Sequence, residues 1–162
     1  MRSRLPVMVA VLLIMTACAD GAEREAKLRE GSVDACALLS QEQAGRVLQA
    51  KEVQTSKGVL TQTWGSACRW STASSDAFIS VVVHTKHAAQ TFRSLGQKPG
   101  VRSRSDLAPR AFQHESKIYL LKRGALVTVE WKIGGDPKSI DEVVRSVLKE
   151  LDALAATQAV HR

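Results

Sequence analysis

The chain has 162 residues, of which 23 are Lys or Arg and 16 are Asp or Glu, and it carries a formal net charge of +7 and three cysteines. Its length excludes two ordinary domains in addition to a leader. Since 44% of the residues are hydrophobic and 24% are charged, the chain can bury a core and lacks the composition of a disordered protein. Only 4% of the residues are aromatic, so we expect neither nucleic-acid binding nor a surface that stacks bases or sugars.

The first 17 residues have the organisation of an export signal. Arg2 and Arg4 precede an uncharged apolar run over residues 5–15, which is too short to span a membrane. Small residues and then Cys18 follow the run. This order resembles the lipobox of bacterial lipoproteins, and the resemblance implies that a signal peptide of residues 1–17 is removed and that Cys18 receives diacylglycerol and palmitate. The alternative is an ordinary signal peptide cleaved nearby, which would leave Cys18 as a spare thiol.

A lipid anchor of this kind predicts a location in the bacterial cell envelope, because several acyl chains together hold a protein stably at a membrane. In a Gram-negative host, Ala19 directly after the modified cysteine favours the outer membrane facing the periplasm, since an Asp at that place resembles an inner-membrane retention signal. The alternative is the inner membrane, because Asp20 follows one place later and some bacteria read that position. Residues 18–32 are polar and charge-mixed, with Leu28 as their only large apolar residue, and they predict a tether. Without residues 1–17 the chain keeps 21 basic and 16 acidic residues, a formal charge of +5.

One α+β domain is predicted over residues 33–155, followed by a frayed tail over residues 156–162. In chain order we expect a helix over 41–50, one or two short edge strands within 51–65, strands at 67–71 and 77–84, a helix over 86–95, a basic loop over 97–109, a weak strand at 111–113, a hairpin of 117–122 with 125–133, and a last helix over 139–154. Together these elements predict an antiparallel sheet of about 4–6 strands with helices packed on one face.

Caps and alternation support these elements. Ser40 with Gln43, and Ser139 with Glu142, have the spacing of capping boxes at the start of the first and last helices. For the middle helix, Thr85 is the expected N-cap and Gly96 the expected stop. In the second arm of the hairpin, apolar and polar residues alternate over 127–133. This period of two predicts a sheet with one solvated face.

Cys36 and Cys68 are predicted to form a disulfide. An exported pair normally bridges because its compartment is oxidising, and closing a loop of about 32 residues would stabilise the fold by roughly 3–4 kcal/mol. The competing interpretation is a nucleophilic Cys68, since residues 65–70 are similar to the Gly-Ser-Cys-Trp context of papain-like enzymes. The inserted Ala67 and the absence of Asn from the chain disfavour that interpretation.

Two short motifs carry a resemblance that spans most of residues 33–154. The first reads Asp34-Ala35-Cys36-Ala37-Leu38-Leu39-Ser40, and the second reads Cys68-Arg69-Trp70. They resemble the Asp-x-Cys-x-Leu-Leu-Ser/Thr and Cys-x-aromatic motifs of small exported bacterial lipoproteins of an uncharacterised family. The resemblance implies an exported domain with a disulfide, and it implies no reaction. At Ala108 and Pro109 the chain departs from the family's Asp-Leu-Gly-Asp-Ala-like motif.

No constellation in the sequence points to catalysis, a cofactor or a metal. His84 and His87 are three residues apart, but Lys86 between them is a poor neighbour for a cation. The carboxylates of Asp141 and Glu142 are explained by the dipole at a helix start rather than by acid–base chemistry. There is no Gly-x-Ser-x-Gly elbow and no phosphate-binding glycine loop. We therefore expect no cofactor, no metal and no enzymatic activity.

A basic stretch in the second half is the one feature that predicts a partner. Its candidate residues are Lys98, Arg102, Arg104, Arg110, Lys122 and Arg123. On one face they would suit anionic lipid headgroups, lipopolysaccharide phosphate or an acidic protein, and the alternative is an ordinary solvated surface. The sequence thus predicts a membrane-anchored envelope lipoprotein that acts as a non-enzymatic binding or assembly module. The alternative function is a cell-envelope hydrolase or thiol enzyme.

Overall fold

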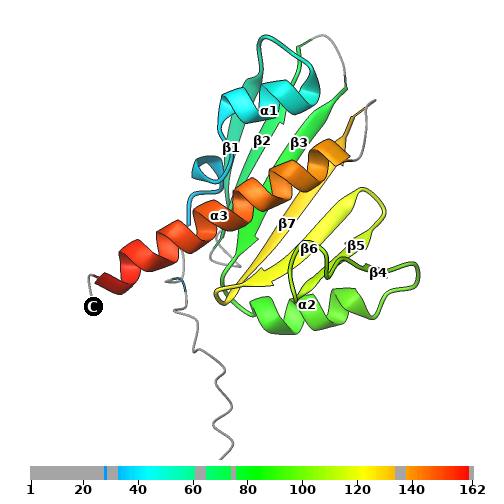
Figure 1. The fold of residues 1–162 in the computed structure, drawn as a ribbon, viewed down its shortest axis with the longest axis vertical. Coiled ribbons are helices and arrows are strands. Elements are labelled where there is room, and N and C mark those ends of the chain that lie inside the picture. Colours follow the sequence, from blue (N-terminus) through cyan, green and yellow to red (C-terminus); the bar gives the residue numbers. More distant parts are fainter. Residues whose placement is uncertain (1–27, 29–32, 61–64, 74–75, 134–137, 161–162) are drawn as a thin grey trace, which may run out of the picture.

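In the part of the chain that the structure describes, an antiparallel sheet of seven strands in the order β1-β2-β3-β7-β6-β5-β4 forms the centre (Figure 1). The computed structural model describes residues 28, 33–60, 65–73, 76–133 and 138–160. The strands are β1 (Gln54–Leu60), β2 (Gly65–Ser71), β3 (Phe78–His84), β4 (Arg102–Ser103), β5 (Ala111–His114), β6 (Lys117–Lys122) and β7 (Ala125–Lys132). The helices are the short η1 (Ala35–Ala37), α1 (Gln41–Leu48), α2 (Ala88–Gly96) and α3 (Lys138–Val160). The predicted α+β class is confirmed.

The sheet has more strands than the 4–6 expected from the sequence. One addition is β4, two residues within the predicted basic loop, which pairs Arg102 with Gln113 and Ser103 with Phe112. So short an edge strand has no alternation to reveal it. The predicted hairpin is confirmed as β6 and β7, with Lys122 opposite Ala125 across a two-residue turn. In that turn Arg123 and Gly124 both have positive φ, which suits the twist of a tight hairpin.

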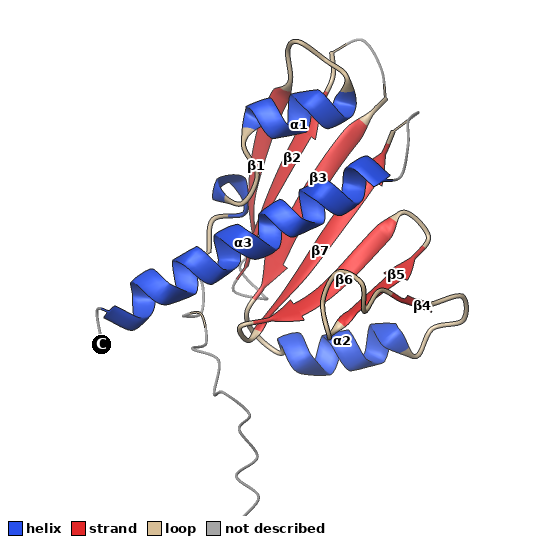
Figure 2. Cartoon of the chain, viewed as in Figure 1, coloured by secondary structure: helices blue, strands red, loops and turns tan. Residues whose placement is uncertain are grey.

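One face of the sheet carries the main core. Alternate residues of the central strands point to this face, where Val81 of β3 lies opposite Val129 of β7 and both are fully buried. Helices α1 and α3 cover them, and α3 runs diagonally over the strands (Figure 2). The buried stripe of α3 comprises Ile140, Val143, Val144, Val147, Leu151 and Ala155. This arrangement matches the apolar periodicity on which the last helix was predicted.

Helix α2 packs on the opposite face, so the expectation that the helices share one face is wrong for this helix. Leu126 precedes the core residue Val127 in β7 and therefore points the other way, yet only 1% of it is exposed. The ring centroid of Phe92 in α2 lies 4.8 Å from that of Phe112, which also has this parity. Phe112 in turn stacks on Tyr119 of β6 at 4.9 Å. These side chains form a second, smaller apolar cluster over β5, β6 and β7.

Two helix boundaries differ from the prediction. Helix α2 begins at Ala88 with His87 as its N-cap, in a left-handed conformation and without a side-chain cap, rather than at the expected Thr85. Helix α3 begins at Lys138, which places Ser139 inside the first turn instead of at the N-cap.

The last helix continues to Val160, and the predicted frayed tail is helical as far as the structure describes it. Alanine has the highest helix propensity, and this end of α3 is rich in it. Ala155 also packs into the core with 2% of its surface exposed. The prediction ended the helix at residue 154, the last of the periodic Val and Leu residues. Ala155 and the helix propensity of alanine extend it further.

Leu28, assigned to the tether, is part of the folded domain. It is 7% exposed and belongs to the main core. Its backbone N–H donates to the carbonyl oxygen of Arg123 at 2.9 Å, at the tip of the β6–β7 hairpin. The predicted signal peptide, Cys18 and the rest of residues 18–32 lie outside the described residues.

Candidate functional site

The disulfide between Cys36 and Cys68 joins the segment before α1 to the second strand of the sheet. Cys68 is fully buried in β2, and the two Cα atoms are 5.0 Å apart. The predicted pairing is confirmed. Because both sulfur atoms are in the bond, neither is a thiol, which leaves Cys68 without the thiolate that a nucleophile requires.

Polar contacts reinforce this junction. The buried hydroxyl of Ser66 accepts a hydrogen bond from the Ala35 N–H at 2.8 Å and donates one to the Val33 carbonyl at 2.7 Å. Asp34 caps η1 by accepting from the Cys36 N–H and forms an ion pair with Lys57 of β1 at 2.5 Å. The hydrogen bond from Lys57 is the main reason that the pKa of Asp34 is lowered. The Asp-x-Cys motif therefore has a structural role in this domain.

Arg104, one of the six predicted patch residues, is occupied by internal partners. Its Nη2 lies 2.9 Å from Oδ2 of Asp106 and 2.7 Å from Oδ1 of Asp141 at the start of α3, and its Nη1 donates to Gln113. Only 18% of its side chain is exposed. The hydrogen bond to Asp106 is the largest cause that raises the pKa of Arg104 above its ordinary value, and it lowers the pKa of Asp106. Arg104 thus fastens the β4–β5 loop to α3 instead of facing a partner.

Lys122 and Arg123 share one carboxylate. Asp152 of α3 places Oδ1 at 2.9 Å from Nε of Arg123 and 3.6 Å from Nζ of Lys122. About a quarter of each basic side chain is exposed, at 24%. These two cations therefore attach the tip of the hairpin to α3. Together with Arg104, three of the six predicted patch residues form internal ion pairs.

The other three predicted cations are exposed but lie in two places. Lys98 follows α2, and Arg102 lies in β4 at the edge of the sheet. Arg110 lies near the other end of β6, where its carbonyl oxygen accepts from the Leu121 N–H at 3.0 Å. The six residues therefore do not form one surface, and among them only Lys98 lies beside α2.

The sequence analysis did not single out two further cations, Lys86 just before α2 and Arg93 within it. Both are exposed. A signal for them was present, because residues 77–105 contain no Asp or Glu. We define the basic α2 face as Lys86, Arg93 and Lys98. Arg102 pairs with Gln113, which pairs with the core residue Ile118, so its side chain lies on the α1–α3 side of the sheet. Within the described part of the chain, none of the three cations of the basic α2 face has an ion pair of 4.0 Å or less, whereas Arg104 in the same stretch has two.

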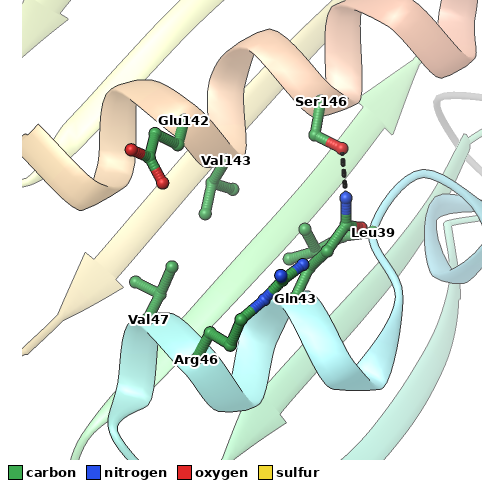
Figure 3. A pocket seen from close by; sticks show the side chains of 7 residues that line it. All are labelled: Leu39, Gln43, Arg46, Val47, Glu142, Val143 and Ser146. Atoms are coloured by element: carbon green, nitrogen blue, oxygen red, sulfur yellow. Dashed lines mark hydrogen bonds between the residues drawn. The ribbon is translucent and has the colours of Figure 1, made fainter.

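A shallow hollow of about 200 Å³ lies between α1 and α3 (Figure 3). Its lining residues are Leu39, Gln43, Arg46, Val47, Glu142, Val143 and Ser146. Gln43 bridges the helices here by donating to Ser146 Oγ at 2.7 Å, while it also completes the predicted capping box with Ser40. Ser146 and Lys149 have the Ser-x-x-Lys spacing of some hydrolases, but Lys149 is exposed and does not line the hollow. The lining residues hold no nucleophile paired with a base.

His84 and His87, which were considered as metal ligands, have different structural settings. Burial lowers the pKa of His84 at the end of β3, so it favours the neutral form, and His87 is the N-cap of α2. Across the described ranges, no three His, Cys, Asp or Glu side chains gather where they could hold a metal ion. In the same residues, no helix is both long enough and apolar enough to cross a membrane.

Similarity to known proteins adds no assignment to this geometry. Comparison of the chain with protein-family models, with curated proteins and with solved structures finds no match. The lipoprotein family that the Asp34–Ser40 motif resembles stays a prediction from the residues.

Proposed function

We propose that this protein is an exported bacterial lipoprotein, anchored in the cell envelope through Cys18, whose folded domain is a non-enzymatic binding or assembly module. The observation that carries the proposal is the leader, in which two arginines, a short apolar run, small residues and Cys18 follow one another in order. In a Gram-negative host the anchor lies in the outer membrane and the domain faces the periplasm.

The disulfide supports export. Disulfides persist in oxidising compartments and are rare in the cytosol, and here Cys36 and Cys68 use both cysteines that follow Cys18 in the sequence. The third cysteine is then the one at the predicted lipidation position. Each cysteine thus has one role, and none is left for thiol chemistry.

A test of the anchor compares the full chain with its Cys18→Ala variant in a bacterial host supplied with labelled palmitate. The parent chain is expected to incorporate label and to fractionate with membranes, and its intact mass should equal residues 18–162 plus the lipid. The variant should carry no label. A mature protein that begins at another residue, or that lacks the lipid mass, would overturn the anchor.

Titration of thiols separates the binding module from a thiol enzyme. The unreduced mature protein is expected to show no reactive thiol, because Cys18 carries lipid through its sulfur and the other two cysteines are bonded to each other. One reactive thiol, mapped by peptide mass to Cys68, would instead favour the enzyme. The measurement needs no knowledge of a substrate.

A further inference from the structure

Charge is distributed unevenly between the two sides of the sheet. The segment from β3 to β4 contains no acidic residue over residues 77–105, and its exposed cations are the three of the basic α2 face and Arg102. Helix α3, on the other side, carries four acidic and three basic residues between Lys138 and Val160. The positive charge of the domain is therefore concentrated around α2.

The cations of the basic α2 face are available to an external anion. All three side chains belong to exposed residues, and the half-buried Phe92 and Leu95 hold the inner side of the helix against the sheet. The nearest carboxylates in sequence, Asp76 and Asp106, are paired with Lys132 and Arg104. Among the described residues, no carboxylate pairs with a cation of the basic α2 face.

The anchored chain enters the domain beside the start of α2, where Lys86 lies. Leu28 bonds to Arg123 at the β6–β7 turn, and His84, which ends β3 just before α2, pairs with Leu126 beside that turn. In Figure 1, α2 starts beside the β6–β7 turn and crosses the lower end of the sheet. Leu28 is 10 positions after Cys18 in the sequence. An extended chain of that length reaches at most about 35 Å, so a lipid on Cys18 would hold this end close to the bilayer.

We propose that the basic α2 face docks onto anionic lipid headgroups of the same membrane that holds the Cys18 anchor. This inference rests on the proposed lipidation. A membrane is the occupant that fits because it is anionic, it lies within reach of the tether, and it needs neither a pocket nor stacked aromatics. The interaction is electrostatic, since α2 exposes no large apolar side chain that could insert. It is therefore sensitive to salt, which screens charges beyond about 10 Å at 0.1 M ionic strength.

The test uses the purified lipidated protein in vesicles of phosphatidylcholine alone or mixed with phosphatidylglycerol. An amine-reactive reagent labels exposed lysines, and mass spectrometry reads each site. Lys86 and Lys98 are expected to react about fivefold more slowly in the anionic vesicles, because each cation near such a surface is held by roughly that factor. Lys149 on the exposed side of α3 is the internal reference and should react equally in both. Raising the ionic strength should remove the protection.

Two matched variants sharpen the result. Arg93→Glu changes the charge of the basic α2 face by two units and should abolish most of the protection of Lys86 and Lys98. Arg145→Glu makes the same change at an exposed position of α3 and should leave the protection intact.

Three outcomes would overturn the proposal. Equal labelling of Lys86 and Lys98 in the two vesicles excludes lipid docking, and protection that survives high salt excludes an electrostatic contact. Protection found only in intact cells assigns the face to a protein partner. Failure of the anchor itself is a separate result, because the intact mass reports lipidation. The unlipidated protein would then be tested by its salt-sensitive sedimentation with the anionic vesicles.

Discussion

The two sides of the sheet differ in how completely they are used for folding. On the α1–α3 side, two helices, a disulfide and a continuous core cover the sheet, and Val81, Val129 and Leu151 are fully buried. On the α2 side, one short helix covers a corner over β5, β6 and β7. Toward β2 and β3 this face stays half exposed, as at Val82 and Phe78. The guanidinium carbon of Arg69 lies 3.8 Å from the ring centroid of Phe78.

The charges also differ between the two sides. On the α3 side, Asp141 pairs with Arg104 and Asp152 pairs with Arg123. The exposed Arg145 and Lys149 of α3 have no ion pair among the described residues, but they share their helix with four acidic residues. The basic α2 face has neither a carboxylate partner in the described chain nor an acidic residue in its segment over 77–105. Ion pairs to α3 thus help to hold the α1–α3 side together, and the α2 side is the one that we propose to meet a membrane. Substitutions on the first side should then cost stability, and substitutions on the second should change binding.

The largest expected effect comes from removing the disulfide with Cys36→Ala and Cys68→Ala together. The two residues are 32 apart in sequence, and the chain-entropy estimate for such a loop is about 3–4 kcal/mol of unfolding free energy. Denaturation in urea, with and without reductant, measures this loss. The parent protein in reductant should match the double variant, and a parent that is insensitive to reductant would show that the bond contributes little.

A Leu→Ala substitution in α3 and another in α2 test the difference in packing between the two sides of the sheet. Leu151→Ala in α3 should lower the unfolding free energy by about 3 kcal/mol, because Leu151 is fully buried and a cavity remains. Leu95→Ala in α2 should lower it by about 1 kcal/mol, because Leu95 is only partly buried and solvent or neighbours can fill the space. Urea denaturation of the two variants measures the difference. Equal losses would mean that α2 is as integral to the core as α3.

A matched pair of arginines tests what the ion pairs on the α3 side contribute. Arg104→Gln should cost about 1–2 kcal/mol of unfolding free energy, since it removes charged hydrogen bonds to Asp106 and Asp141 at a side chain that is 18% exposed. Arg102→Gln, two residues away and exposed, should stay within about 0.5 kcal/mol of the parent. Both variants lose one positive charge, so their difference isolates the ion pairs. If Arg102→Gln were the more destabilising, the assignment of these two residues would be reversed.

Local patterns in the sequence predicted the elements well. The capping box of Ser40 and Gln43, the alternation in β7 and the apolar stripe of α3 each encode a local preference that the fold keeps. The disulfide followed from the cysteine count and the leader. The caps and the periodic patterns depend on residues close in sequence. The disulfide was predictable because only two cysteines remained once Cys18 was assigned to the lipid anchor.

What the sequence did not predict depends on tertiary contacts. The spacing of Ala88, Phe92 and Leu95 reveals an apolar helix face but not which side of the sheet receives it. Arg104 finds Asp141 37 residues away, so a basic loop in the sequence looked like an external patch. Leu28 was assigned to the tether because a single apolar residue among charges carries no period. In each case only the folded chain determines the partner.

The smallest expected effect is a dependence of stability on mildly acidic pH that originates at His84. Burial lowers the pKa of His84, so the folded protein binds its proton less readily than the unfolded chain. Stability should therefore be full above the ordinary pKa of about 6.5 and decline as the pH falls from there through the lower folded-state value. Asp34, whose pKa is lowered by Lys57, acts only in stronger acid, below its ordinary value of 3.8. The two sides thus respond to acid in separate ranges.

Urea denaturation across the range from about pH 7 to pH 5 measures the His84 effect, and His84→Gln should flatten the slope there. Because His84 ends β3 immediately before α2, hydrogen exchange should locate the first acid-induced loosening at the amides of α2 and not at those of α3. A slope that persists unchanged in His84→Gln would assign the titration to another group. Loosening that begins in α3 would contradict the division of the domain into a firmly packed side and a more open one.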